Sequence, residues 1–347
     1  MVVRDLTLRH YRSYAALELA LEPGLVLVVG RNGVGKTNLL ESLHVVTQGF
    51  SPRTRQDAQL IAFGEEAARV AVRGSREARP TELSVTLRRG QAKEARLNGA
   101  RLPSAESLRR ETATLVFTPD RLAVVKGGPA ARRAYFDRVL GRLQPARAGL
   151  PQDYLAALAQ RNAALRRVAL GLSGRDTLAP WTATLADLGL RLGTARHEVL
   201  AALGPPFADR AGELGLPDAR LVYEPAELTV ELLEARLGRD LDRGTTGAGP
   251  HLDDVGIESS GRDLRQFGSQ GEQRLAVLAL LLAEAELLPS EPLLLLDDVL
   301  SELDPGRRRI LAERVSTMGQ TVITATHASS LPVEPAQLVE VEPGTAR

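Results

Sequence analysis

The chain has 347 residues, enough for two or three domains, and with 44% hydrophobic and 25% charged residues its composition is globular. The absence of cysteine excludes a disulfide framework and a cysteine-based zinc site, and the aromatic content of 3% argues against an extensive base-stacking platform. The net charge is +1, and neither a secretion signal nor a membrane-spanning run is evident, so we expect a soluble cytoplasmic protein.

The first predicted elements are strands at residues 2–8 and 17–21, followed by a turn. The apolar run 25–29 predicts a buried strand, and a helix is predicted to begin near residue 38. Residues 30–37 lie between them and match the phosphate-loop pattern G-x-x-x-x-G-K-[ST]. The chain has only three lysines, so a chance match that includes one is improbable.

This loop predicts a site for ATP and Mg²⁺. Its backbone N–H groups would surround phosphates at the helix N-terminus, Lys36 would reach the β- and γ-phosphates, and the Thr37 hydroxyl would bind Mg²⁺. The predicted nucleotide-binding residues here are Gly30, Arg31, Asn32, Gly33, Val34, Gly35, Lys36, Thr37 and Asn38.

The middle of the chain changes from strands to helices. Residues 68–118 contain alternating stretches and a turn signal, which predicts a β-rich subdomain beside the nucleotide fold. Helices are predicted at 129–142, 152–170, 181–203 and 225–238. Six prolines interrupt this region, which favours a compact helical arm over one long coiled-coil hairpin: Pro145, Pro151, Pro180, Pro205, Pro206 and Pro217.

Charge is distributed unevenly along the chain. Residues 51–110 carry a net charge of +6 and residues 119–200 a net charge of +7, whereas residues 251–347 carry −8. This asymmetry suggests nucleic acid bound on one face, although a solvated arginine-rich surface explains the charges equally well. The arginines that we select as candidate DNA contacts are Arg53, Arg55, Arg132 and Arg133.

The C-terminal part predicts a parallel sheet with a second group of site residues. A Gly/Ser-rich loop at 268–271 precedes a long helix at 272–288, and Ser269 is its candidate N-cap. The apolar strand that begins at residue 292 then ends at two carboxylates, Asp297 and Asp298. Since ligands bind at the carboxyl ends of parallel strands, one carboxylate there can hold Mg²⁺ and the other can orient or deprotonate the attacking water.

This combination resembles the ATP-binding-cassette ATPases and, within them, the Rad50/SMC/RecF branch. In that superfamily two heads enclose two nucleotides. The resemblance implies that Ser269, Gln270 and Gly271 belong to the signature that contacts the γ-phosphate held by the other head. It implies that Asp304, with Ser269, contacts the partner head, and that His327, after the strand 321–326, senses the γ-phosphate.

The resemblance also implies catalytic roles for Lys36, Asp298 and His327, with Thr37 and Asp297 as the metal ligands. The chain departs from the superfamily pattern at Asp298, where a glutamate is usual. The shorter carboxylate predicts slow hydrolysis.

Six motifs resemble the RecF group of this branch, and together they extend over nearly the whole chain. They lie at residues 8–14, 35–41, 127–133, 160–162, 249–254 and 297–304.

We therefore expect an α/β fold: an ABC-type ATPase head, made of a P-loop parallel sheet and a β-rich subdomain, with an inserted helical arm domain. Residues 1–118 and 241–347 would form the head, and residues 119–240 the arm.

The resemblance implies an ATPase of recombinational repair that forms an ATP-dependent homodimer. It would bind double-stranded DNA near single-strand gaps without sequence preference and assist RecO and RecR in loading RecA. Two alternatives are the nucleotide-binding subunit of an ABC transporter and an SMC- or Rad50-like chromosome protein.

Overall fold

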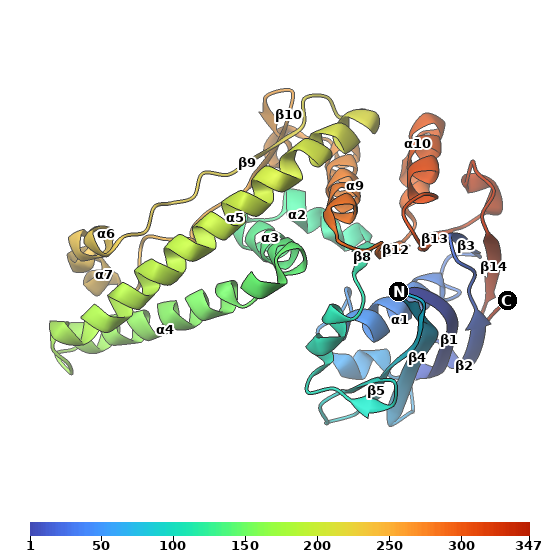
Figure 1. The fold of residues 1–347 in the computed structure, drawn as a ribbon, viewed down its shortest axis with the longest axis horizontal. Helices are drawn as coiled ribbons and strands as arrows, with labels where there is room; N and C mark the ends of the chain where they lie inside the picture. Colours follow the sequence, from blue (N-terminus) through green and yellow to red (C-terminus); the bar gives the residue numbers. More distant parts are fainter. The chain divides into compact units, whose positions relative to one another are not determined.

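The computed structural model describes the backbone of residues 1–347 and every side chain except those of Arg110, Pro119, Asp120 and Glu302. The chain divides into two compact units (Figure 1). Unit 1 comprises Met1–Arg121, Glu213–Gly215 and Leu288–Arg347, and unit 2 comprises Leu122–Gly212 and Leu216–Leu287. The predicted division into a head (residues 1–118 and 241–347) and an arm (residues 119–240) followed the change of sequence pattern along the chain, and it stays a prediction.

A mainly parallel sheet forms one half of unit 1. Its strand order is β15-β14-β3-β13-β12-β8, and only β15 runs antiparallel to its neighbour among the described strands. The strands are β3 (Leu25–Val29), β8 (Thr114–Phe117), β12 (Leu293–Leu296), β13 (Thr321–Ala325), β14 (Gln337–Glu342) and β15 (Thr345–Ala346). Every residue of β3, β8, β12 and β13 is buried, as expected for a parallel sheet covered on both faces.

An antiparallel sheet forms the other half of unit 1, with the order β2-β1-β4-β5-β6-β7. Its strands are β1 (Val2–Tyr11), β2 (Tyr14–Ala20), β4 (Ala67–Arg76), β5 (Arg79–Arg88), β6 (Glu94–Leu97) and β7 (Ala100–Arg101). Buried and exposed residues alternate along β2 and β4, because only one face of this sheet is covered. The predicted β-rich subdomain and the turn at Asn98 and Gly99 are both confirmed.

Helix α1 (Lys36–Gln48) lies between the two sheets and contacts strands of both (Figure 1). It is buried almost all round rather than along one stripe, and one hydrophobic core joins it to both sheets. Unit 1 also contains α10 (Pro305–Val315) and the short 3₁₀ helices η1 (Asp57–Leu60), η2 (Ala105–Arg110), η3 (Pro119–Leu122), η6 (Val299–Glu302) and η7 (Ala328–Ser330). The position of α1 fixes the start of that helix against the parallel sheet.

Unit 2 is mainly helical, and α4 and α5 are its long helices (Figure 1). Its α-helices are α2 (Ala123–Lys126), α3 (Pro129–Leu143), α4 (Leu150–Ala169), α5 (Ala179–Glu213), α6 (Val230–Ala235), α7 (Leu237–Arg243), α8 (Leu264–Phe267) and α9 (Gln270–Leu287). Its other elements are η4 (Pro145–Arg147), η5 (Arg175–Leu178) and the small sheet of β9 (Arg220–Val222), β10 (Gly256–Ser259) and β11 (Arg262–Asp263).

Two helix predictions in unit 2 are wrong. Helix α5 continues through Pro205 and Pro206, where a break was expected. Leu203 and Phe207, on either side of these prolines, are completely buried, and this packing outweighs the loss of backbone hydrogen bonds. The single helix expected at 225–238 is replaced by the shorter α6 and α7. Nowhere in the described part of the chain is there a helix both long and apolar enough to cross a membrane.

A buried ion pair holds α4 to α7 in unit 2. Nη1 of Arg161 donates to Oδ2 of Asp240 at 2.9 Å and to Oγ1 of Thr246 at 2.7 Å, and both charged side chains are almost fully buried. The next residue, Asn162, accepts from the hydroxyl of Thr246 at 2.8 Å. The motif at 160–162 is therefore the centre of a polar network inside the unit.

We predict that Asp240→Asn lowers the free energy of unfolding by about 3–5 kcal/mol, because it leaves the Arg161 charge buried without a counter-ion. Urea denaturation followed by circular dichroism measures this change. As a control, Asp187→Asn removes the exposed partner of Arg191 and should cost less than about 1 kcal/mol. Equal losses in the two variants would contradict the role given to the buried pair.

Candidate nucleotide-binding site

The predicted phosphate loop connects the end of β3 to the start of α1. Gly35, the N-cap of α1, has φ 122°, a conformation that side-chain-bearing residues rarely adopt. A Cβ atom at Gly35 would come within 2.9 Å of the Tyr14 hydroxyl and 3.0 Å of the Ser13 hydroxyl. Tyr14 also donates a hydrogen bond to the Gly35 carbonyl at 3.1 Å. The residues at the turn between β1 and β2 thus contact the phosphate loop at Gly35.

Lys36 is buried within this loop. Its Nζ donates to the carbonyl oxygens of Gly30 at 2.6 Å and Arg31 at 3.0 Å. Burial lowers the pKa of Lys36, and the carboxylates of Asp298 and Asp297 oppose that shift. The ammonium group therefore lies in the field of the acidic strand end. Phosphate oxygens are stronger acceptors for it than carbonyl oxygens are.

Asp297 links the loop to the parallel sheet. It follows β12, is 6% exposed, and its Oδ1 accepts from the hydroxyls of Thr37 at 3.1 Å and Thr324 at 2.7 Å. Burial raises the pKa of Asp297, and the hydrogen bonds from Thr324 and Thr37 act in the opposite direction. The register of β3, β13 and β12 brings these groups to one edge, because Thr324 pairs with Val28 and its neighbour Ile323 pairs with Leu296.

The oxygens of Thr37 and Asp297 fit a Mg²⁺ ion. Magnesium binds oxygen at 2.0–2.1 Å in octahedral geometry, so neighbouring ligand oxygens lie about 3 Å apart. The separation of 3.1 Å between Thr37 Oγ1 and Asp297 Oδ1 matches that spacing. A hydroxyl and a carboxylate are also the hard oxygen donors that Mg²⁺ prefers beside nucleotide phosphates.

Asp298 and His327 lie at the same edge of the sheet, after the neighbouring strands β12 and β13. Asp298 is exposed and has φ 49°, a left-handed conformation that costs on the order of 1 kcal/mol, and its N–H donates to Thr324 Oγ1 at 2.8 Å. His327 is exposed and precedes η7. The structure thus gathers both residues near Asp297, while their catalytic roles stay predictions.

In unit 2, Ser269 begins α9 through a capping box. Its Oγ accepts from the N–H of Glu272 at 3.2 Å, and its own N–H donates to Oε2 of Glu272 at 2.7 Å. The predicted N-cap is confirmed. Accepting that bond leaves the hydroxyl proton of Ser269 available for donation. Gln270 and Gly271 are exposed in the first turn of α9, and contact with a partner's nucleotide stays a prediction for all three.

Asp304, the other predicted dimer contact, is an exposed N-cap in unit 1. Its Oδ1 accepts from the N–H of Arg307 at 3.0 Å, which starts α10. The structure explains its local role, and contact with a partner stays a prediction.

Arg132 and Arg133 serve a structural role in unit 2. Arg132 is buried and donates to both oxygens of Asp254, at 2.6 and 2.5 Å, while Arg133 donates to the carbonyl of Asp253 at 2.6 Å. These bonds join the family motifs at 127–133 and 249–254. These contacts already occupy donors of both guanidinium groups, and DNA contact at these two arginines stays a prediction.

Arg53 and Arg55 lie on the loop after α1. Arg53 approaches Asn38 and Glu41, at 3.2 and 3.4 Å from Nη1. Arg55 is exposed, and no ion pair involves it among the described residues. Of the four candidate arginines, Arg55 is the one best placed to contact DNA.

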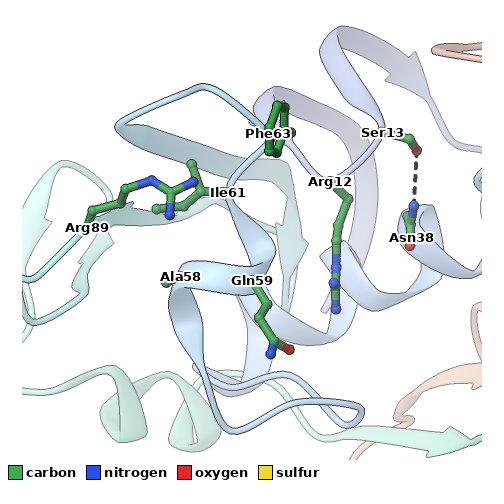
Figure 2. Close-up of a pocket in the computed structure, with 8 residues that line it drawn as sticks. All are labelled: Arg12, Ser13, Asn38, Ala58, Gln59, Ile61, Phe63 and Arg89. Carbon is green, nitrogen blue, oxygen red and sulfur yellow. Dashed lines mark hydrogen bonds between the residues drawn. The ribbon is translucent and has the colours of Figure 1, made fainter.

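An open pocket of about 530 Å³ lies beside the first turn of α1 (Figure 2). Asn38, directly after Thr37, lines it and donates to the Ser13 hydroxyl at 3.0 Å. Its volume is within the range of small-molecule sites. The lining residues are Arg12, Ser13, Asn38, Ala58, Gln59, Ile61, Phe63 and Arg89. Sequence reasoning missed this pocket, because residues 58–63 show no pattern, and Asn38 is the lining residue that was predicted to bind nucleotide.

Comparison with known proteins places these features in one family. The chain matches the family described as RecF/RecN/SMC N terminal domain over residues 2–344. It is similar to the DNA replication and repair protein RecF of Heliobacterium modesticaldum, with 35% identity over 94% of this chain and 93% of the relative. The RecF protein of Frankia alni is 37% identical, over 96% of each chain.

Solved structures of RecF and Smc proteins are also similar to this chain. The recombination mediator protein RecF with ATP, from the RecFOR pathway, has a TM-score of 0.88 and 28% identity, covering 99% of this chain and 96% of that chain. The Smc head domain of Pyrococcus furiosus, bound to a domain of ScpA, has a TM-score of 0.64 and 18% identity, covering 99% of this chain and 95% of that chain. The second likeness concerns the fold alone.

We predict that Lys36→Met weakens the binding of Mg·ATP by about 100-fold, because it removes charge-assisted hydrogen bonds to the phosphates. Isothermal titration calorimetry with a slowly hydrolysed ATP analogue measures the affinity. Lys93→Met is the matched control, since Lys93 pairs with Asp57 at 3.0 Å and should leave binding unchanged. Wild-type affinity in Lys36→Met would show that the loop does not bind the phosphates.

Proposed function

The chain belongs to the RecF family of DNA replication and repair proteins, and we propose that it is an ATP-driven DNA clamp. Two copies would close on duplex DNA when ATP is bound and separate after its hydrolysis. The observation that supports the ATPase part is the pair of hydrogen bonds from Thr37 and Thr324 to Asp297, since it joins a phosphate loop to a carboxylate that would hold Mg²⁺. Family membership favours this function over that of a transporter subunit.

Different residues of unit 1 would bind the phosphates, hold the metal ion and assist hydrolysis. Lys36 would bind the β- and γ-phosphates, and Thr37 and Asp297 would hold Mg²⁺, which neutralises charge on those phosphates. Asp298 would orient or deprotonate the attacking water, and His327 would respond to the γ-phosphate. The short side chain of Asp298 favours slow turnover.

The pocket beside α1 would take the nucleoside part of ATP. It begins at Asn38, so a nucleotide whose phosphates occupy the loop can reach it (Figure 2). Phe63 is fully exposed there and offers an aromatic face for the base, and Arg12 offers hydrogen-bond donors to the ribose.

The second half of the catalytic site would come from another copy of the chain. The Ser269 hydroxyl can still donate its proton to a phosphate oxygen. The N-terminus of α9 would also attract a negatively charged phosphate. Two copies placed head to head would each supply Ser269 to the nucleotide of the other. Asp304 would lie at the same interface.

DNA would bind through phosphate contacts, since the arginine-rich middle of the chain offers charge and few aromatic residues. We extend the pathway of the relatives to this chain: it would recognise duplex DNA near single-strand gaps and assist RecO and RecR in loading RecA. Such a function agrees with the expected cytoplasmic location.

We predict that Ser269→Arg binds ATP normally as a monomer but does not form an ATP-dependent dimer, because the added cation and bulk would occupy the position of the partner's γ-phosphate. Analytical ultracentrifugation with and without Mg·ATP distinguishes the two states. Ser260→Arg, at an exposed turn of the same unit, is the control and should dimerise.

A mixture of Ser269→Arg with Lys36→Met sharpens this test. The mixed dimer retains one complete site, so partial ATPase activity should return. If Ser269→Arg dimerises like the wild type, the start of α9 lies away from the interface.

DNA binding in the presence of Mg·ATP should fall steeply with salt and depend little on sequence. We predict that Arg55→Ala makes the log–log salt slope shallower by about 0.9, the value for one lost phosphate contact, while ATP affinity stays unchanged. Fluorescence anisotropy over a salt series measures the slope. Arg191→Ala, whose arginine already pairs with Asp187, is the control. An unchanged slope in Arg55→Ala would place the DNA surface elsewhere.

A further inference from the structure

Glu41 is a buried acid in the helix that follows the phosphate loop. It is 1% exposed and lies on α1, four residues after Thr37. Arg12 donates to both of its oxygens, from Nε and Nη2 at 2.9 Å each. The Ser51 hydroxyl donates to Oε1 at 2.6 Å, and Nη1 of Arg53 approaches Oε2 at 3.4 Å. The Glu41 carboxylate therefore binds donors from two separate loops, one that follows β1 and one that follows α1.

The two arginines that pair with Glu41 lie at different ends of the candidate nucleotide site. Arg12 lines the pocket beside α1, where the nucleoside would lie (Figure 2). Arg53 also donates to Oδ1 of Asn38 at 3.2 Å, so its guanidinium lies at the first turn of α1.

The balance of charge in this cluster favours an anion. Two guanidinium groups share one carboxylate, so a net positive charge remains beside the phosphate loop. Arg12 is the more buried of the two, whereas the Arg53 side chain is 37% exposed. Arg53 thus keeps donors that can turn to a phosphate oxygen while Glu41 and Asn38 hold its position.

We propose that Glu41 is a positioning residue for the nucleotide: it holds Arg12 at the nucleoside end and Arg53 at the terminal phosphate, and so makes the site prefer a triphosphate to a diphosphate. The inference rests on the proposed function, in which this site binds ATP. Glu41 touches no phosphate itself and acts through the arginines.

The competing explanation for the buried Glu41 is a purely structural role, since its hydrogen bond with Ser51 also holds the loop after α1 against that helix. Both explanations predict that removing the carboxylate lowers stability. Only positioning predicts a change in the ratio of ATP to ADP affinity, because the two nucleotides differ by the phosphate that Arg53 would contact.

The test measures the affinities of ATPγS and ADP by calorimetry, with Mg²⁺, for the wild type, Glu41→Gln, Arg53→Ala and the double variant. We expect the affinity ratio to fall about tenfold in Glu41→Gln, as for the loss of one charge-assisted hydrogen bond. Arg53→Ala should lower the ratio similarly. In the double variant, the second substitution should add little, because both changes remove the same interaction.

Two further variants keep the test decisive. Ser51→Ala removes the 2.6 Å hydrogen bond to Glu41 without removing charge, together with the acceptor for the N–H groups of Arg53 and Thr54, and should lower the ratio in the same direction by less. If Glu41→Gln does not fold, the affinity ratio of Ser51→Ala is used in its place. Glu41→Asp retains the charge and should retain more of the ratio than Glu41→Gln does.

Asp240→Asn is the matched control for stability, because it breaks another buried arginine–carboxylate pair and should leave the affinity ratio unchanged. An unchanged ratio in folded Glu41→Gln, or in Ser51→Ala where Glu41→Gln does not fold, overturns the proposal. Additive effects of Glu41→Gln and Arg53→Ala also overturn it. Failure of the wild type to bind either nucleotide would instead reject the proposed function.

Discussion

The candidate site depends on the position of Asp297, whose Oδ1 accepts hydrogen bonds from Thr37 at 3.1 Å and Thr324 at 2.7 Å. The three residues belong to the start of α1, the end of β12 and the interior of β13. They meet because β3, β13 and β12 are parallel and in register, so their carboxyl ends share one edge. The burial of α1 between two sheets then fixes where the phosphate loop must end.

In the proposed function, ATP binding and ATP hydrolysis have different requirements. Unit 1 alone presents a phosphate loop, two oxygens with the spacing for Mg²⁺ and an adjoining pocket, and with these parts it would bind Mg·ATP. The capping box at Ser269 in unit 2 presents a further donor on a rigid helix start. In the proposed dimer that donor completes the site of the other copy, so closure of two chains would be coupled to the presence of the γ-phosphate.

The sequence predicted the parts of the site that depend on local pattern. The phosphate loop, the strand before Asp297 and the N-cap at Ser269 each combine a distinctive residue type with an adjacent apolar run. Networks between distant segments could not be predicted, because no local pattern records them. Arg132 and Asp254 are 122 positions apart, and an arginine that pairs there has the same sequence signature as one that binds DNA. The contacts of Glu41 with distant residues and the pocket were missed for the same reason, and α5 crosses two prolines because of packing that propensity does not include.

The central claim is that the chain binds ATP alone but hydrolyses it only with a second copy. The most direct test measures ATP turnover per chain against protein concentration at saturating Mg·ATP. The account predicts that turnover per chain rises with concentration and reaches a plateau as dimers form. A constant turnover per chain down to concentrations at which ultracentrifugation shows only monomers would contradict it, because one chain would then contain the whole catalytic site.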